Sequence, residues 1–542
     1  MADPDADGLG EDTASAIDVE QRPFRRRVLI NTAAVGVANG WAMLSTLLSL
    51  PFVLHGLGAT RFGVWALLQT FSAVGGWFSL LDLGLSTATT RQVAAHHAID
   101  ERRGVSATLG SSLAMFCGLG LVSGVAFGVL GSPLFSVLID VPSTLVDEVR
   151  LAVLAFSVQV ALDLVCGGFQ AALDGFQRVD LSRAVDIVRR TLVAVATAVA
   201  ATASGDLGQV AVASAAGVAI AAVFGLGLLI RTARSFRPSL DKGEARALLA
   251  YGKTVAVLRP LGVLHRSIDR LIVGAILGPA AVSLVEVATQ LQNGADAVLS
   301  ATSYAVVPSA ARLEAHGETS KLRELTATGT RYVLLATWPV AALTAVLSAP
   351  AIAVWVGKSY SAAAGLVVLA VVSVALAAPA QVGSNMLLGT GRAGTILKVA
   401  LIGIAINAGL SVVLVNLVGT AGTFQATVVS ALVSSPLLVN AAIDDIDLRA
   451  RTFWSEAVLP AVPAALAAGA LAGLVVLAPL APWPTLLAGG FAGSIGWLAG
   501  AIRFGLKPSE VFAVSRRLHP IRRPTRSEVR NDRRPPGAAS RG

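Results

Sequence analysis

Charged residues are scarce in this chain. Asp, Glu, Lys and Arg together make up only 14% of its 542 residues, whereas 54% are hydrophobic, and the mean hydropathy is +0.71. Soluble globular domains carry about a quarter charged residues. The low charge excludes a soluble globule and predicts an all-α polytopic membrane protein.

Cysteine is almost absent as well. Cys117 and Cys166 are the only two, and both fall inside apolar runs. This excludes a disulfide framework and a cysteine-based metal site. His96 and His97 lie in a short basic loop, and no group of His, Cys and acidic residues has the spacing of metal ligands. We therefore expect no metal site.

The sequence has no compact basic domain, although its pI is near 10.1. The basic residues flank apolar runs or lie in a C-terminal tail that is rich in Arg and Pro and nearly free of aromatic residues. Membrane topology explains this placement, so we expect no nucleic-acid partner. We expect the tail to be disordered and to contact anionic lipid head groups.

Signatures of an enzyme are also missing. Gly252-Lys253-Thr254 resembles the end of a phosphate-binding loop, but Ala247 replaces the first glycine and no strand precedes it. Asp445 and Asp447 lie in a loop too short for a catalytic domain, and no outer loop is large enough for a glycosyltransferase. We expect no catalytic residues, no ATP use and no bound cofactor.

What the sequence does contain is fourteen apolar runs, each long enough to cross about 30 Å of hydrocarbon. The first has no small-residue cleavage site, so we expect a retained span and not a signal peptide. The runs begin near Val28, Phe62, Val105, Leu151, Ala184, Val210, Thr254, Ala280, Gly329, Ser361, Gly394, Thr420, Ala457 and Trp483.

The basic residues predict the orientation of these runs. With both termini in the cytoplasm, 36 of the 42 lysines and arginines fall in cytoplasmic segments, a count that includes Arg189 and Arg190. The outer loops hold only Arg61, Arg150 and Lys358. This asymmetry predicts a multi-pass protein of the cytoplasmic membrane with both ends inside.

Four short patterns recur in the same order along the two halves of the chain. The first pairs Leu57, Gly58, Phe62 and Gly63 with Leu277, Gly278, Val282 and Ser283; the second pairs Pro133 and Val137 with Pro350 and Val354; the third pairs Leu173, Gly175 and Arg178 with Leu387, Gly389 and Arg392; the last pairs Gly205 and Gly208 with Gly419 and Gly422. Glycine and proline recur at helix ends in any case, but the shared order favours a duplication. The copies are six runs apart, so the two halves have the same orientation.

This duplication predicts two parallel six-helix lobes followed by two extra helices. The expected parts are a disordered cytoplasmic tail, 1–27; an N-terminal lobe, 28–230; a cytoplasmic linker, 231–253; a C-terminal lobe, 254–443; a cytoplasmic loop, 444–456; extra helices 13 and 14, 457–504; and a basic disordered cytoplasmic tail, 505–542.

Several motifs resemble one family. The sequence is similar to the polysaccharide flippases, O-antigen or Wzx type, of the multidrug/oligosaccharidyl-lipid/polysaccharide exporter superfamily, over roughly residues 28–443. The motif residues are Gly58, Phe62 and Gly63; Asp82, Gly84 and Arg91; Ile268-Asp269-Arg270; Trp355-Val356-Gly357; and Gly389 with Arg392. Where relatives often carry Tyr after the second Leu-Gly turn, this chain has Leu284, Val285 and Glu286.

The resemblance implies a non-enzymatic transporter whose lobes alternate access. Its implied substrate is an undecaprenyl-pyrophosphate-linked oligosaccharide, which moves from the inner to the outer leaflet. Polysaccharide synthesis enzymes are candidate partners. The two extra helices would hold the lipid tail, although their glycines also fit ordinary helix packing.

The candidate substrate site lies in the run Thr254–Leu277. Arg259, Arg266 and Arg270 fall on one helical face, because at 100° per residue Arg266 and Arg270 lie within about 20° of Arg259, one on either side. Charge at mid-bilayer normally faces a cavity, so this face predicts a diphosphate-binding site. Pro260 invites a helix break there. In the alternative interpretation, Arg259 snorkels to the surface, and Arg266 and Arg270 only pair with Asp269 and another helix.

Acidic residues inside apolar runs are candidates for coupling transport to an ion. A carboxylate in low dielectric needs a cation or a proton, so a proton gradient, a sodium gradient or the membrane potential would drive transport. The alternative is structural pairing with the three arginines. The candidates for ion coupling or pairing are Asp163, Asp269, Glu286 and Asp296, and Asp82 is a further acid inside a run.

Polar residues inside the runs would line a hydrated path for the glycan, or would bond helix to helix. They are Asn31, Asn39, Gln69, Gln159, Gln290, Gln292, Asn293, Gln381, Asn385 and Asn407.

Two other functions remain open. One is a cation-coupled multidrug exporter of the same superfamily, a class that typically has an acid in the first-lobe cavity and twelve helices; residues 28–54 contain no acid. The other is a membrane-embedded glycan polymerase. The sequence does not predict which glycan is carried.

Overall fold

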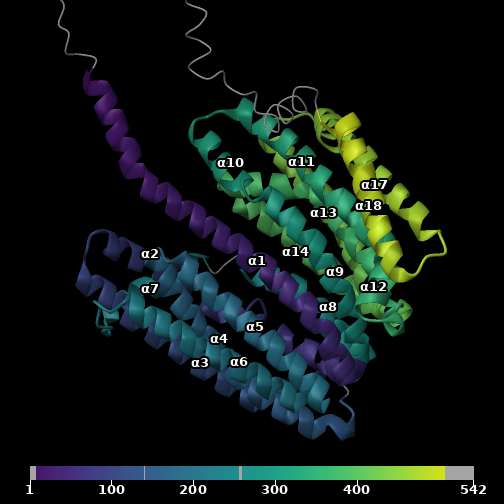
Figure 1. Cartoon of the computed structure of the whole chain (residues 1–542), viewed down its shortest axis with the longest axis horizontal. Helices are drawn as coiled ribbons and strands as arrows, with labels where there is room; N and C mark the ends of the chain where they lie inside the picture. The colour runs from purple at the N-terminus through teal and green to yellow at the C-terminus, as the bar shows by residue number, and fades with distance from the viewer. Residues whose placement is uncertain (1–7, 140, 256–258, 507–542) are drawn as a thin grey trace, which may run out of the picture.

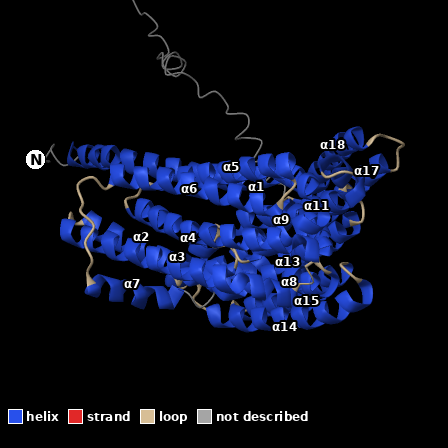
Figure 2. Cartoon of the chain, turned by 90° about the horizontal axis from the view of Figure 1, so that it is seen from below, coloured by secondary structure: helices blue, strands red, loops and turns tan. Residues whose placement is uncertain are grey.

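The computed structural model describes residues 8–139, 141–255 and 259–506. The side chains of residues 8–29, 32, 138, 252–255, 259–261, 265 and 266 lie outside the described part. Within these ranges the chain is helical and contains no strand (Figure 2). The predicted C-terminal tail falls almost wholly outside the description.

The first half of the chain forms one group of helices, drawn in purple through blue to teal in Figure 1. Their bounds are α1 Gly8–Thr70, η1 Trp77–Asp82, α2 Leu85–Ala98, α3 Arg102–Leu138, η2 Ser143–Leu145, α4 Val146–Gly175, α5 Val179–Ser204, α6 Leu207–Thr232 and α7 Lys242–Val255.

The second half forms the group drawn in teal to yellow, and α1 runs between the two groups (Figure 1). Its elements are α8 Arg259–Leu277, α9 Pro279–Ser303, α10 Val306–Ala315, α11 Thr319–Val346, α12 Ser348–Trp355, η3 Lys358–Tyr360, α13 Ala363–Gly389, α14 Ala393–Val418, α15 Ala421–Asp445, α16 Ala450–Phe453, η4 Trp454–Val458, η5 Leu459–Ala461, α17 Val462–Val476, α18 Pro482–Gly500 and η6 Ala501–Gly505.

The predicted duplication is visible in the backbone. Gly58 and Gly278, paired by the sequence pattern, adopt φ 72°, ψ 169° and φ 81°, ψ 173°. Such angles are open to glycine and strained for other residues. Gln177 and Gly391, which precede the paired residues Arg178 and Arg392, also share a positive φ, of 59° and 81°. The two halves therefore turn in the same way at matching points of the chain.

The predicted second run is not one helix. The chain is helical from Phe62 to Thr70, leaves the helix between Phe71 and Gly76, and becomes helical again in η1 and α2. Gly75 and Gly84 have positive φ, of 85° and 75°, and Leu83 is left-handed as well, at 44°. The expectation of an uninterrupted span near Phe62 was therefore wrong, because Gly75 and Gly76 interrupt a stretch that is apolar enough to look continuous.

The N-terminal boundary also differs from the expectation. Helix α1 begins at Gly8, inside the segment 1–27 whose composition predicted disorder. Ala, Glu, Gln and Arg in this segment are strong helix formers, so helix α1 continues into it despite the charge.

Nine helices in the described ranges are long and apolar enough to cross a membrane, or ten if α11 and the bent α12 are one span. The remaining predicted runs are the broken second one and those that became α5, α8 and α9. Those three helices carry the charged residues described below, so they are less apolar than the nine. The fold is a polytopic membrane bundle, and the number fourteen stays a prediction.

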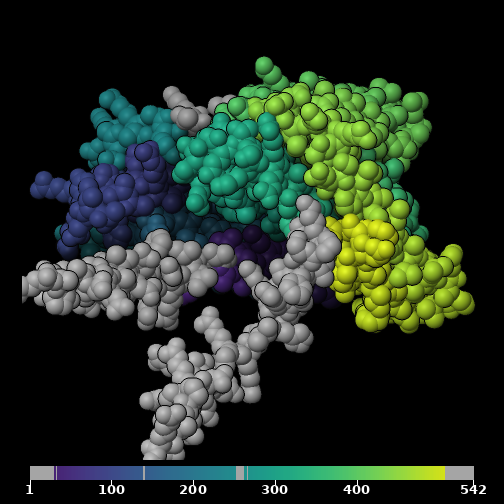
Figure 3. Space-filling view, turned by 90° about the horizontal axis from the view of Figure 1, so that it is seen from above, coloured from purple at the N-terminus to yellow at the C-terminus, as the bar shows by residue number. Residues whose placement is uncertain are grey.

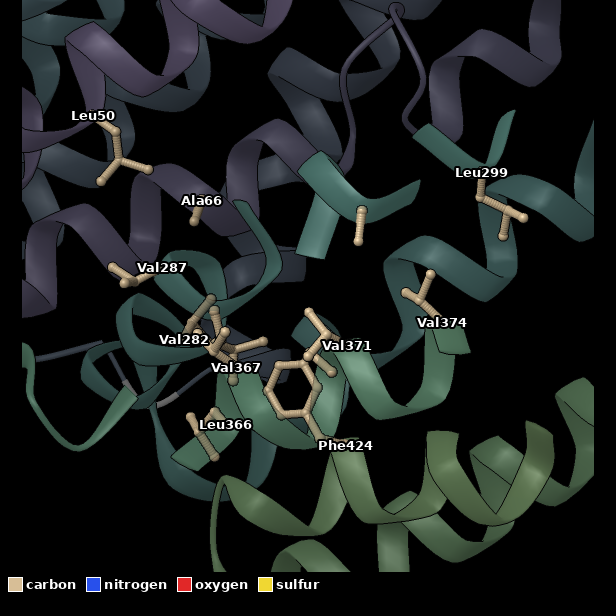
Figure 4. Close-up of a cluster of buried hydrophobic side chains, with 14 of the residues drawn as sticks. Leu50, Ala66, Val282, Val287, Leu299, Leu366, Val367, Val371, Val374 and Phe424 are labelled. Atoms are coloured by element: carbon tan, nitrogen blue, oxygen red, sulfur yellow. The ribbon is translucent and has the colours of Figure 1, made fainter. Parts of the chain in front are cut away.

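The halves meet along α1, which packs on α5 of its own half and on α9 of the other. Close to the Gly58 turn, Gly63 lies so near Pro279 that no side chain fits between them. The indole nitrogen of Trp355 donates to the carbonyl oxygen of Leu47 at 2.7 Å. A shared apolar core joins Leu50 and Ala66 of α1 to residues of α9, α13 and α15 (Figure 4).

Helices α17 and α18 lie at the edge of the second half, in yellow in Figure 3, and pack on α11 and α12. Glycines along α18 let it approach α17 and α11 closely; Gly493, for example, has Leu343 and the Ala468 carbonyl against it. In this structure these glycines therefore serve helix packing.

Candidate functional site

A cavity of about 510 Å³ lies between the two halves. Helices α1, α4 and α5 line it from the first half, and α8, α9 and α15 line it from the second. The non-helical residues Ser72, Val74, Gly75 and Gly76 of the broken second run also line it. Non-helical backbone inside a membrane is tolerated where it faces protein or a water-filled cavity, and broken helices in transporters often mark the binding site.

Arg270 on α8 is the member of the predicted arginine row whose side chain is described, and it lines this cavity. Its Nε lies 2.9 Å from Oε2 of Glu286 on α9. The other oxygen of Glu286 accepts from Gln290 Nε2 at 2.6 Å. Arg270 therefore combines both interpretations of the sequence: it is paired, as the alternative held, and it faces open space, as the binding hypothesis requires.

The side chains of Arg259 and Arg266 lie outside the described residues. Both positions are helical, on α8 with Arg270. Whether they share its cavity stays a prediction.

The first half contributes a second group of charges from α4 and α5. Arg189 reaches Asp163 Oδ1 at 3.3 Å through Nη1 and Asp186 Oδ1 at 3.2 Å through Nη2. Arg190 reaches Asp186 Oδ2 at 2.9 Å through Nε. Asp163, Arg189 and Arg190 line the cavity. Asp163 is therefore paired, but with a residue of α5 and not with any of the three arginines named from sequence.

Arg189 and Arg190 are the functional candidates that sequence reasoning missed. The prediction assigned them to a cytoplasmic loop, and their position within the cavity corrects that assignment. The available signal was their place inside the run that begins near Ala184, next to Asp186 at helical spacing. A charge that interrupts an apolar run faces the bundle interior more often than lipid.

Asp269 on α8 sits in a group of oxygen atoms from α14 and α15. Its Oδ1 accepts from Ser411 Oγ at 3.3 Å and its Oδ2 from Thr427 Oγ1 at 3.4 Å. The Asn407 amide, turned with nitrogen toward Asp269, donates to Oδ1 at 3.2 Å; turned the other way, it presents an oxygen there. The hydroxyl of Thr423, which is fully buried, lies beside the same carboxylate.

The remaining acids and polar residues separate into two sets. Asp296 lines the cavity. Of the residues expected to line a glycan path, Gln69, Gln159, Gln290, Gln292 and Asn293 also line it. Gln381 lines a smaller cavity of about 320 Å³ inside the second half, and Asn385 donates to the Ser303 carbonyl at 3.0 Å.

The motif residues of the first half serve mostly to shape the backbone. Phe62 lines the cavity, whereas Gly58 forms the kink in α1. Asp82 Oδ1 accepts two hydrogen bonds from Ser86, one from its backbone amide at 2.9 Å and one from its hydroxyl at 2.8 Å. Gly84, between them, has a left-handed backbone conformation. Arg91 stacks on the Tyr251 ring, 4.6 Å from its centre, and so ties α2 to α7.

The motif of the second half closes the end of α13. Gly389 packs against the carbonyl of Val307 with no room for a side chain. Arg392 pairs with Asp445 and lies 3.9 Å from Glu314. These residues therefore hold α10, α13 and α15 together away from the cavity.

Within the described ranges, no group of three or more His, Cys, Asp or Glu side chains is arranged to hold a metal ion. The cavity instead brings together arginines, carboxylates, amides and hydroxyls from both halves. Such a surface can bind an anion and polar hydroxyl groups in a water-filled space.

Comparison with known proteins gives a family and a fold. Residues 57–365 match the family described as "Polysaccharide biosynthesis protein". Among solved structures, the chain is similar to the lipid II flippase MurJ in an inward closed conformation, with TM-score 0.69, 11% identity, and coverage of 86% of this chain and 98% of that one. It is also similar to an inward-facing multidrug resistance MATE family transporter of the MOP superfamily, with TM-score 0.58, 16% identity, and coverage of 76% and 98%. No curated protein matches the chain by sequence.

Proposed function

The chain belongs to the polysaccharide biosynthesis protein family and has the fold of MOP superfamily transporters, and from this membership we propose that it flips a lipid-linked oligosaccharide across the cytoplasmic membrane. The substrate carries an undecaprenyl-pyrophosphate anchor and serves cell-surface polysaccharide biosynthesis. One observation carries the proposal: Arg270 lines a cavity between the two halves. The fold likeness to a lipid II flippase supports a lipid-linked substrate.

The diphosphate is the part of this substrate that Arg270 recognises. A guanidinium group grips phosphate oxygens with two parallel hydrogen bonds and keeps its charge at any physiological pH. Glu286 holds Nε of Arg270, so the edge that carries the Nη nitrogens serves the ligand. Arg259 and Arg266 extend the same site along α8.

The glycan lies against the amide and hydroxyl side chains of the cavity. Gln290, Gln292 and Asn293 on α9 line the same cavity as Gln69 and Gln159 of the first half. A volume of about 510 Å³ is in the range of small-ligand pockets. It therefore takes the diphosphate and the sugar next to it, while more distant sugars stay in water.

Transport proceeds by alternating access of two lobes, residues 28–230 and 254–443. The Gly58 and Gly278 turns, the Gly63 contact with Pro279 and the Trp355 bond to Leu47 lie where the lobes meet. Opening and closing about these contacts exposes the cavity to one leaflet and then the other. Both termini are cytoplasmic in this proposal, as the basic residues indicate.

Asp269 supplies a site for the coupling cation. Carboxylate and hydroxyl oxygens are among the ligands that hard cations prefer, and the Asp269 carboxylate has the Ser411 and Thr427 hydroxyls beside it. The Thr423 hydroxyl lies beside the same carboxylate. Asp269, Asn407, Ser411, Thr423 and Thr427 would hold a monovalent cation, and its electrochemical gradient would drive the cycle.

The test is the surface polysaccharide of a strain that lacks the gene and carries a variant in its place. Arg270→Ala removes the phosphate contact, worth about 1.5–3 kcal/mol for charged hydrogen bonds, so export should fall at least ~10-fold. Arg183→Ala is the matched control. Arg183 is also an arginine of a membrane helix and also pairs with an acid, Asp174, but it does not line the cavity. Normal export by Arg270→Ala at wild-type protein levels would contradict the proposal.

The same strain separates the rival functions. A multidrug exporter would leave the surface polysaccharide unchanged and alter drug sensitivity on deletion. A glycan polymerase would extend sugar chains as purified protein. The cavity charges favour the flippase, because three arginines of the described part line it.

A further inference from the structure

Arg190 is a second cation at the cavity, and the proposed binding site described above does not include it. It comes from α5 in the first half, its side chain is 30% exposed, and it lines the same cavity as Arg270. Asp186 holds its Nε at 2.9 Å. Among the described residues no group bonds to its Nη nitrogens, so that end of the guanidinium is available to a ligand.

Arg190 and Arg270 share this mode of attachment. In each, Nε lies 2.9 Å from a carboxylate oxygen of an acid of its own half: Arg190 donates a hydrogen bond to Asp186, and Arg270 forms an ion pair with Glu286. An arginine fixed through Nε has lost much of its rotational freedom before a ligand arrives, so less entropy is lost on binding. Both arginines are therefore prepared for an anion.

Arg189, the neighbour of Arg190, is different. Both of its Nη nitrogens are engaged, by Asp163 and Asp186, and its side chain is only 10% exposed. Arg189 neutralises the two acids, and in doing so it keeps Asp186 in place to hold Arg190. It serves as a structural support, whereas Arg190 faces the ligand.

We propose that Arg190 binds the second phosphoryl group of the substrate, so that the diphosphate is held between Arg190 of the first half and Arg270 of the second. This inference rests on the proposed function and names a further residue of its binding site. A diphosphate presents two anionic groups in sequence, and one arginine fork occupies one of them. The bound substrate then forms a bridge that draws the two halves together.

Two lipid probes test this role with the purified full chain in lipid nanodiscs. They are undecaprenyl pyrophosphate and undecaprenyl monophosphate, which share a tail and differ by one phosphoryl group. Wild-type protein should bind the diphosphate more tightly. Arg190→Ala should weaken diphosphate binding by about 10- to 100-fold and leave monophosphate binding unchanged, whereas Arg270→Ala should weaken both.

Controls separate a binding role from a folding role. Arg183→Ala, on the same helix but outside the cavity, should match the wild type with both probes. Arg190→Lys keeps the charge without the fork and should restore part of the diphosphate preference. Unchanged monophosphate binding by Arg190→Ala also shows that the variant is folded.

The outcomes distinguish this inference from the function on which it rests. If Arg190→Ala binds both probes like the wild type, Arg190 has no part in binding and the inference is overturned, while the proposed function stands. If Arg190→Ala weakens both probes equally, the residue does not select the second phosphoryl group, and the inference also fails. If wild-type protein binds neither probe, the proposed function itself fails.

Discussion

Several charged residues of the cavity form ion pairs with one another, and whether a residue is paired decides whether it can bind a ligand or an ion. Asp163 is 2% exposed and tied to Arg189, so it acts as a partner and not as a free acid. Asp269 has hydroxyl and amide neighbours instead of a described cation partner. Of these two acids, Asp269 is therefore the one suited to bind an ion.

The first prediction concerns Asp269. Sodium that binds the folded protein should raise its unfolding temperature at constant ionic strength, because a ligand that binds only the native state stabilises it. Asp269→Asn removes the charged ligand and should abolish this rise. The measurement is thermal unfolding in detergent with sodium chloride or choline chloride.

Asp180→Asn is the control, since Asp180 pairs with Arg178 outside the cavity. It should keep the sodium effect. An equal rise with sodium in Asp269→Asn would place the ion elsewhere, and a response to pH alone would identify a proton as the coupling ion.

At this scale the sequence predicted residue types better than residue partners. Spacing along one helix was enough to place Arg270 on a polar face, and the structure puts it in a cavity. It could not show that Glu286 would be its partner or that Arg189 would neutralise Asp163, because those contacts join helices separated by loops. Arg190 was assigned to a loop because the orientation was predicted from a count of basic residues, which ignores how far each residue lies inside its apolar run.

Among the elements, the glycine turns set how the two halves fit together. Gly58 and Gly278 redirect the chain with nearly the same angles, and Gly63 then meets the first residue of α9, Pro279. Close approach of this kind is typical of helix contacts in membranes. In the proposed alternating-access cycle, the two halves would move against each other at this contact.

The second prediction tests that contact. An alanine Cβ at Gly63 would lie 1.7 Å from the Pro279 carbonyl oxygen, so the backbone must shift. We expect Gly63→Ala to destabilise the protein by about 1–3 kcal/mol, as overpacking does, and to reduce export. Gly40→Ala is the control, because nothing lies within 4 Å of the added atom. A Gly63→Ala protein with wild-type unfolding temperature and export would refute the role of the contact.

Element boundaries were predictable where apolar runs end at turns, and not where a run is broken inside. The repeated Leu-Gly pattern marked a turn before the run expected to begin near Ala280, and α9 does begin next to it, at Pro279. Residues 71–84 are mostly apolar, and glycine is common in membrane helices, so the break at Gly75 and Gly76 gave no clear signal. Only the structure shows that this break lines the cavity.

For the whole molecule, the fold could be inferred early because hydrophobicity and duplication are properties of the entire chain. Long apolar runs and four repeated patterns predicted a helical bundle in two parallel halves, and the fold likeness to MurJ covers 86% of the chain. The number of spans is harder to read, since α5, α8 and α9 carry charges into the cavity. A transporter needs polar helices at its centre, and those helices weaken the hydrophobic signal.

The third prediction concerns orientation. In a protein whose Cys117 and Cys166 are replaced by serine, a new cysteine at Ala98 should be protected in intact cells, and one at Ser204 should react with an impermeant thiol reagent. Both positions are exposed in the structure, Ala98 at the C-terminal end of α2 and Ser204 at the C-terminal end of α5, and the predicted topology puts these two ends on opposite sides of the membrane. The excess of basic residues near Ala98 predicts that end to be cytoplasmic. If the cysteine at 98 reacted and the one at 204 were protected, the orientation in the membrane would be the reverse of the predicted one.

The most direct test of the central claim is translocation by the purified protein in liposomes. The substrate is an undecaprenyl-pyrophosphate oligosaccharide with a fluorescent sugar, and a membrane-impermeant quencher reports how much of it lies in the outer leaflet. We predict that wild-type protein moves the labelled lipid between leaflets and that Arg270→Ala slows this at least ~10-fold, with Arg183→Ala as active as the wild type. Translocation at the same rate by Arg270→Ala, or none by wild-type protein, would contradict the account.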